Sequence, residues 1–213
     1  MNNLNKIPIH DSSLRHSTGQ AIYIDDMPEQ ENLLHGAPVL SKVACGKIKN
    51  INSDKLNDLP FFTKIITAKD IPGENEIGPI KNGEPILAEE FFSYLGQPVA
   101  IVLAKTHQEA NYASSLVEIE VEFTTKPILN LDDAYKQKSF LEDPMILEKG
   151  NVKKDMSQSD HRLSGDFEIG GQDHFYLETH VAMTFPGENN EYVVWSSTQH
   201  PTEVQHGVGK VLN

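Results

Sequence analysis

The sequence predicts a protein of the α+β class that is organised in two parts, and three observations support this prediction. Between Gln97 and Phe123 the chain reads as a strand, a helix and a second strand. From His161 onward the pattern changes to repeated strand-like segments followed by one helix. The length of 213 residues, 38% of them hydrophobic, is enough for two modest cores, because domains commonly contain roughly 100–200 residues.

The first part begins with strands and turns. Ala21–Ile24 reads as a short strand, and the turn residues Asp25, Asp26 and Pro28 follow it directly. The next expected elements, by residue number, are a strand at 33–44, a helical turn at 54–59, a strand at 61–67 and a Pro- and Gly-rich loop at 71–85.

The strand–helix–strand unit has the clearest local pattern. Pro98–Ala104 is an unbroken apolar strand. Thr106 can cap a helix, and Glu109 three residues later completes a capping box. Val117–Phe123 then alternates apolar residues with glutamates, as a strand does when one face meets water. We therefore expect a largely one-sided sheet and interpret these glutamates as its solvated face rather than as catalytic groups.

The second half contains a linker and the start of another domain. Leu131–Lys136 reads as a short helix, and Pro144–Asp160 is polar and loop-like. Strands are expected at 163–169, 174–185 and 192–197, and a final helix has Pro201 in its first turn. The predicted organisation is a first domain at 1–126, a connecting segment at 127–160 and the start of a second domain at 161–213.

Composition excludes several classes of protein. The net charge of −13 argues against partners such as nucleic acid or an anionic membrane surface, which demand a basic face. The N-terminus lacks the apolar core of an export signal, so we expect a cytoplasmic protein. Cys45 is the only cysteine, which excludes an internal disulfide and any cysteine-ligated iron–sulfur cluster built by this chain alone.

The segment Gly170–Thr179 carries the strongest chemical signal. Glycine lacks a Cβ, so Gly170 and Gly171 allow a backbone or ligand to approach closely. The neutral amide of Gln172 can donate and accept hydrogen bonds, which suits recognition of an oxo or carbonyl oxygen. A β-bulge followed by an ordinary strand is the structural alternative.

Other catalytic and metal signals are weak. His174 and His180 are six residues apart, as are His200 and His206, and neither pair has the i, i+4 spacing of a helical zinc site. His174 and His180 would nevertheless share one face of a strand, so a ligand pair there stays open. The sequence contains no nucleophile elbow, no Walker loop and no dinucleotide fingerprint.

Several segments, taken together and in order, resemble those of a known family. The matching segments are His16–Pro28, Thr67–Gly73, Gly96–Ala100, Glu148–Val152 with Ser164–Asp166, Gly170–Thr179 and Ser196–Pro201. They are similar to the molybdenum hydroxylases, the family of xanthine dehydrogenases and aldehyde oxidases, and within it to the molybdopterin-binding subunit of the two-chain bacterial form. Asp173 stands where the family usually has Glu.

The resemblance implies a fold and a reaction. It implies an α/β hammerhead domain followed by the first strands and helix of an incomplete molybdopterin-binding domain. The implied reaction, part of purine catabolism, is the oxidation of hypoxanthine and xanthine to urate with oxygen from water. Electrons would pass from molybdenum–molybdopterin to iron–sulfur clusters, FAD and NAD on a partner subunit, so the complete enzyme is expected to be a hetero-oligomer.

The resemblance also implies which residues act. Gln172 would hydrogen-bond an oxygen on molybdenum without ligating the metal directly, and Gly171 would allow a close backbone approach of the cofactor. The family's catalytic and purine-binding residues lie beyond Asn213, so none is assigned here. The chain is therefore expected to be an N-terminal portion of the subunit and inactive alone. Two alternatives are a non-catalytic module that docks on the partner subunit, and a hydroxylase of aldehydes or other N-heterocycles.

Overall fold

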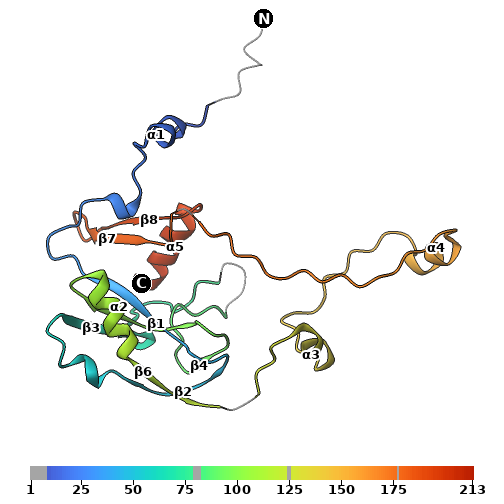
Figure 1. The fold of residues 1–213 in the computed structure, drawn as a ribbon, viewed down its shortest axis with the longest axis horizontal. Coiled ribbons are helices and arrows are strands. Elements are labelled where there is room, and N and C mark those ends of the chain that lie inside the picture. The colour runs from blue at the N-terminus through green and yellow to red at the C-terminus, as the bar shows by residue number, and fades with distance from the viewer. Residues whose placement is uncertain (1–8, 79–82, 124–125, 177) are drawn as a thin grey trace, which may run out of the picture. The chain divides into compact units, whose positions relative to one another are not determined.

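The computed structural model describes residues 9–78, 83–123, 126–176 and 178–213 (Figure 1). Its contacts divide the chain into two units: residues 1–126 with 177–213 form the first unit, and residues 127–176 form the second. Helices and small antiparallel sheets occur together along the chain, which confirms the predicted α+β class. The domain boundaries expected from the sequence stay a prediction.

The first unit contains a three-stranded antiparallel sheet with the predicted apolar strand at its centre. Strand β5 (Pro98–Ala104) lies between β1 (His35–Leu40) and β3 (Phe62–Thr67). Val99 and Val102 point to opposite faces of β5, and both are fully buried. A strand that is covered on both faces needs apolar residues at every position, which explains the unbroken run in the sequence.

A second three-stranded sheet completes this part of the unit. Strand β2 (Gly46–Asn52) lies between β4 (Phe91–Phe92) and β6 (Glu118–Glu122), antiparallel to both. The glutamates of β6 are exposed, whereas Ile119 and Val121 are half-buried, so the predicted solvated face is confirmed. The expectation of a largely one-sided sheet is wrong for β5, because both faces of this strand are covered. Strands β5 and β6 belong to different sheets that share an apolar cluster between them.

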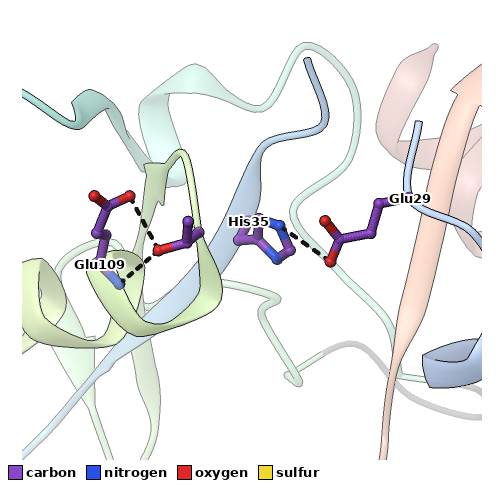
Figure 2. Close-up of polar contacts among 4 residues, drawn as sticks. Glu29, His35 and Glu109 are labelled. Atoms are coloured by element: carbon purple, nitrogen blue, oxygen red, sulfur yellow. Dashed lines mark hydrogen bonds and ion pairs between the residues drawn. The ribbon is translucent and has the colours of Figure 1, made fainter. Parts of the chain in front are cut away.

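Helix α2 (His107–Leu116) begins after the predicted N-cap, Thr106. The Thr106 Oγ1 atom accepts a hydrogen bond from the backbone N–H of Glu109 at 3.2 Å and donates one to Glu109 Oε2 at 3.0 Å (Figure 2). Ala110 and Ala113 are fully buried and let the helix approach the first sheet closely. These contacts confirm the predicted helix and its N-cap. The predicted capping box is only half formed, because the Glu109 carboxylate bonds the Thr106 hydroxyl instead of the Thr106 backbone N–H.

The beginning of β1 carries a charged contact that is also visible in Figure 2. His35 Nε2 lies 3.7 Å from Glu29 Oε1, and the two groups form an ion pair when the imidazole is protonated. The Glu29 side chain is 67% exposed, so solvent screens the pair and its contribution to stability is small.

The N-terminal part of the unit corrects one expectation. The strand predicted at Ala21–Ile24 is wrong, because a 3-10 turn, η1, forms at Ile24–Asp26. Asp26 Oδ2 accepts a hydrogen bond from the backbone N–H of Tyr23 at 3.0 Å and closes the chain into this turn. The remaining short elements of the region are helix α1 (Ser13–Thr18) and the 3-10 turns η2 (Asp54–Leu56) and η3 (Ala68–Asp70).

The second unit has two short helices. Helix α3 (Leu131–Lys136) has the predicted bounds, and the side chain of Asn130 caps it. Helix α4 (Val152–Gln158) lies in a region that the sequence predicts to be a loop, so that prediction is wrong there. Asn151 Oδ1 accepts a hydrogen bond from the backbone N–H of Lys154 at 3.0 Å, and this N-cap allows a polar segment to begin a helix.

The strand expected at Leu163–Ile169 is also wrong. No helix or strand occurs at 159–176, and the side chains of Leu163 and Phe167 are 98% and 88% exposed. A strand is stabilised by a ladder of hydrogen bonds to a neighbour, and no described strand pairs with this segment. Alternation of apolar residues alone therefore does not make this segment a strand.

The C-terminal part of the chain belongs to the first unit. Strands β7 (Ala182–Pro186) and β8 (Tyr192–Ser196) form an antiparallel hairpin, so the strand expected at 174–185 is right only near its end. Helix α5 (Pro201–Leu212) confirms the predicted final helix, with Pro201 in its first turn. The His200 ring caps it, because Nδ1 accepts a hydrogen bond from the backbone N–H of Glu203.

Within the described ranges, no helix combines the length and the apolar composition that crossing a membrane requires.

Candidate functional site

Gln172 lies in the extended part of the second unit, outside any helix or strand. Its side chain is exposed, and its amide makes no hydrogen bond to another described residue. Both the donor and the acceptor of this amide are therefore available to a bound group. The expected hydrogen bond between Gln172 and an oxygen on molybdenum stays a prediction.

The two glycines before Gln172 are surrounded by open space. A Cβ built on Gly170 or Gly171 meets no described atom within 4 Å. Neither glycine is needed for packing inside this chain, since a side chain could be accommodated at both positions. The space suits the close approach expected at Gly171, and that role also stays a prediction.

The histidines near Gln172 do not form a ligand pair of the kind considered above. The His174 ring stacks on Tyr176, with ring centroids 5.7 Å apart and planes inclined by 5°. His174 and His180 do not lie on one strand, so the premise that they share a strand face is wrong. In the described part of the chain, no three His, Cys, Asp or Glu side chains gather as a metal site requires.

Glu178, which belongs to the first unit, contacts the N-terminal turn of the same unit. Glu178 Oε1 accepts a hydrogen bond from the backbone N–H of Ile24 at 3.4 Å. Ile24 and Glu178 both belong to segments that carry the family resemblance. The sequence holds no local signal for this contact, because 154 residues separate the partners.

The first unit contains an open cavity of about 810 Å³. Its walls come from the loop after Gly73, from the hairpin of β7 and β8, and from helix α5. Charged and ionisable side chains are spread around a mostly apolar lining, and none of the lining residues belongs to 161–176. The lining includes Glu76, Ile77, Ile86, Val194, His200, Glu203, His206, Val208, Lys210 and Val211.

Glu76 organises the loop that forms one wall of this cavity. Its Oε1 atom accepts hydrogen bonds from the backbone N–H groups of Gly78 at 2.7 Å and Glu84 at 2.9 Å, and its Oε2 atom accepts one from Gly83 at 2.7 Å. These three bonds lower the pKa of the Glu76 carboxyl, and the bond from Gly83 has the largest effect. They do so because they favour the charged form of the carboxyl. The sequence suggests only a loop here, and the role of Glu76 is not recognisable from it.

Comparison with known proteins identifies the two parts of the chain. The sequence model of the aldehyde oxidase and xanthine dehydrogenase a/b hammerhead domain matches residues 18–126, and that of the molybdopterin cofactor-binding domain matches residues 135–213. These matches confirm the hammerhead-type domain and the start of a molybdopterin-binding domain that the sequence resemblance implies.

Individual relatives agree with these matches. The chain is 38% identical over 207 residues to xanthine dehydrogenase of Calliphora vicina, covering 96% of this chain and 15% of that protein. It is 37% identical over 206 residues to aldehyde oxidase 2 of Macaca fascicularis, with the same two coverages. The chain therefore spans about 15% of the length of these relatives.

Solved structures show the same fold. The aldehyde oxidoreductase of Desulfovibrio gigas matches 93% of this chain with a TM-score of 0.75 and 26% identity, and this chain covers 24% of it. Quinoline 2-oxidoreductase of Pseudomonas putida 86 matches 96% of this chain, and 28% of its own chain, with a TM-score of 0.78 and 20% identity, a likeness of fold alone. The chain belongs to the aldehyde oxidase and xanthine dehydrogenase family of molybdenum hydroxylases.

Proposed function

We propose that the chain is part of a cytoplasmic molybdenum hydroxylase that oxidises hypoxanthine and xanthine to urate with oxygen from water. The observation that supports this proposal is the 38% identity to a xanthine dehydrogenase across 96% of the chain. Electrons would pass to iron–sulfur clusters, FAD and NAD on a partner subunit, which makes the complete enzyme a hetero-oligomer. In the same proposal, residues 1–126 are the hammerhead domain, 127–160 the connection and 161–213 the start of the molybdopterin-binding domain.

The residues present fit one contact to a molybdenum–molybdopterin group. When bound, that group supplies the two-electron oxidation. Gln172 offers an exposed amide without a partner in the described chain, and Gly170 and Gly171 leave the approach to it open. An amide stays neutral at every working pH, so Gln172 would orient an oxygen ligand by hydrogen bonding without adding charge.

In the complete enzyme, the Gln172→Ala variant is expected to lower turnover of xanthine by about 10–100-fold, the usual effect of removing a residue that orients a metal's ligand. The substitution removes the hydrogen bond, while Gln172→Glu keeps acceptors but loses the donor and adds a charge. Steady-state rates of xanthine-dependent NAD reduction, with the molybdenum content of each preparation, measure the effect.

The control for this experiment is Gln158→Ala, the same change at an exposed position at the end of α4. It is expected to retain the rate of the unaltered enzyme. If Gln172→Ala retains that rate as well, at an equal molybdenum content, the proposed contact to the molybdenum centre is wrong.

The purified chain of 213 residues is expected to form no urate from xanthine and to bind no stoichiometric molybdopterin. The segment that carries Gln172 is exposed along its length, whereas cofactor sites are concave and enclose most of the ligand surface. Elemental analysis for molybdenum and the absorbance of urate measure the two quantities. Urate formation, or one molybdenum atom for each chain, would contradict the expectation.

An aldehyde or another N-heterocycle is the second candidate substrate class. The near-equal identity to an aldehyde oxidase, 37%, and the fold shared with an aldehyde oxidoreductase favour it. Comparing kcat/KM of the complete enzyme for xanthine, for an aromatic aldehyde and for quinoline separates the candidates, since specificity is a ratio of these constants. A purine hydroxylase would show its highest value with xanthine.

A non-catalytic docking role is the remaining candidate. The first unit has its own buried core, built from both sheets and α2, so it can present a rigid surface to a partner without doing chemistry. Co-purification of the isolated chain with iron–sulfur and flavin subunits would support this role, and a strictly solitary chain would contradict it.

A further inference from the structure

The C-terminal end of helix α5 is held by a loop from the hammerhead-type domain. The backbone N–H of Gly73 donates a hydrogen bond to the carbonyl oxygen of Val211 at 2.9 Å, and that of Glu74 donates one to Lys210 at 2.8 Å. The last carbonyls of a helix have no partner within the helix. A segment far away in the sequence therefore satisfies two of the carbonyls at the end of α5.

The next two residues anchor the chain that follows those donors. Asn75 pairs with the backbone of Leu87 in both directions: its Nδ2 donates to the carbonyl oxygen at 2.8 Å, and its Oδ1 accepts from the N–H at 3.0 Å. Leu87 is buried, so this pair joins the loop to the core. Glu76 accepts the three backbone hydrogen bonds described above and fixes the turn that follows.

The approach between loop and helix requires a glycine at position 73. A Cβ on Gly73 would overlap the carbonyl oxygen of Lys210 and would lie 2.8 Å from that of Val211. Both obstacles are backbone atoms, which cannot rotate away as the end of a side chain can. The loop can therefore lie this close to the end of α5 only with glycine at position 73.

We propose that Gly73–Glu76 is a docking motif for the C-terminal end of α5, in which Asn75 and Glu76 are positioning residues for the donors Gly73 and Glu74. The motif joins the hammerhead-type domain to a helix within the segment that matches the molybdopterin cofactor-binding domain. Since α5 and Glu76 both line the cavity, the same motif sets one of its edges. The proposal holds whichever substrate the enzyme oxidises.

Hydrogen–deuterium exchange of the full chain, analysed by peptide, tests the motif. In Glu76→Ala, amides at 201–213 are expected to exchange faster by a factor on the order of ten, because the helix opens more often once its donors are no longer held. Amides of β5 should exchange as in the unaltered chain. Glu76→Gln retains one acceptor oxygen and should give a smaller increase.

The control is Glu84→Gln. Glu84 lies in the same loop as Glu76, and this variant removes one negative charge, as Glu76→Gln does. The Glu84 side chain is exposed and makes no hydrogen bond or ion pair with a described residue, so exchange at 201–213 should not change. An equal effect of Glu84→Gln and Glu76→Gln would overturn the proposal, because it would trace the effect to charge. Equal acceleration of α5 and β5 would also overturn it, as would unchanged exchange of α5.

Gly73→Ala provides a second route that leaves every carboxylate in place. It is expected to accelerate exchange at 201–213 at least as much as Glu76→Ala, since the overlap with Lys210 forces the loop away from the helix.

Gly83→Ala is not a suitable control, because Gly83 has a positive φ of 133°. Gly170→Ala is suitable: its Cβ meets nothing within 4 Å, and it should leave α5 unchanged. If Gly73→Ala leaves α5 as protected as before, the proposed docking is wrong even where the Glu76 variants fail to fold.

Discussion

Replacing Leu56 with alanine is expected to lower the free energy of unfolding of the first unit by about 2–5 kcal/mol, the usual cost of a large cavity in a core. Leu56 is fully buried although it lies in the short turn η2. It belongs to the cluster that joins α2 to the first sheet, together with Val39, Ala100, Val102, Ala113 and Val117. The two alanines of that cluster are small, so little side-chain mass is available nearby to fill the space.

Thermal unfolding followed by circular dichroism measures this effect. At roughly 2–4 °C for each kcal/mol, the melting temperature should fall by about 4–20 °C. Leu95→Ala is the matched control, because Leu95 is 67% exposed and its truncation should change the melting temperature by no more than about 2 °C. Similar decreases for the two variants would mean that η2 does not belong to the cooperative core.

The elements that the sequence predicts correctly are those whose own residues indicate which faces are buried and where the element begins. The strand β5 is a continuous apolar run because both of its faces are covered, and α2 begins directly after its N-cap residue Thr106. Strand β6 alternates because only one of its faces is buried. In each case the residues of the element itself report the environment of the element.

Strand β2 shows why other elements were missed. Its apolar residues Ile48 and Ile51 are three positions apart, which does not match the two-residue period of a strand. The pairing with β6 shifts register between Ile48 and Asn50, and an extra residue at such a bulge brings both isoleucines to the buried side. The partner strand β6 creates this irregularity, so the sequence of β2 alone does not contain it.

The segment around Gln172 shows the opposite error. Leu163, Phe167 and Ile169 alternate as in a strand, but they are exposed and form no ladder in the described chain. The alternation indicates that the segment could pair as a strand, whereas a strand forms only beside a neighbour to which it hydrogen-bonds. For Gln172, the sequence shows a neutral amide beside two glycines. Its proposed role comes from the family resemblance and not from local geometry.

The contact between Gly73 and α5 could not be predicted for a third reason. Gly and Pro at 71–85 indicate a loop but not its partner, since turn residues describe only the path of their own backbone. The requirement for glycine at position 73 arises from the carbonyl oxygens of Lys210 and Val211. Such a requirement becomes visible only once both segments are placed.

Replacing Gly46 with alanine is expected to destabilise the first unit by about 1–3 kcal/mol, the usual cost of overpacking a core. Gly46 is buried at the start of β2, and a Cβ there would overlap Val121 Cγ1 on the neighbouring strand β6. Phe92 and the backbone of Glu122 lie 3.4 Å from the same position, so the added methyl group has no free side to move toward. Urea unfolding measures the change in stability.

The double variant Gly46→Ala/Val121→Ala isolates the cause, because Val121→Ala removes the methyl group that collides with the new Cβ. Val121→Ala alone should also destabilise, by leaving a gap beside β2. If overlap is the cause, the double variant is more stable than the sum of the single effects by at least about 0.5 kcal/mol, as expected for residues in contact. Gly36→Ala in β1 is the control, since its Cβ would come no closer than 3.2 Å to Ile101 Cγ2 and 3.5 Å to Leu103 Cδ2. Two outcomes would contradict this explanation: additive single effects, or a Gly36→Ala variant as unstable as Gly46→Ala. The loss of stability would then come from the backbone of a strand glycine. The packing of β2 against β6 would not depend on Gly46 lacking a side chain.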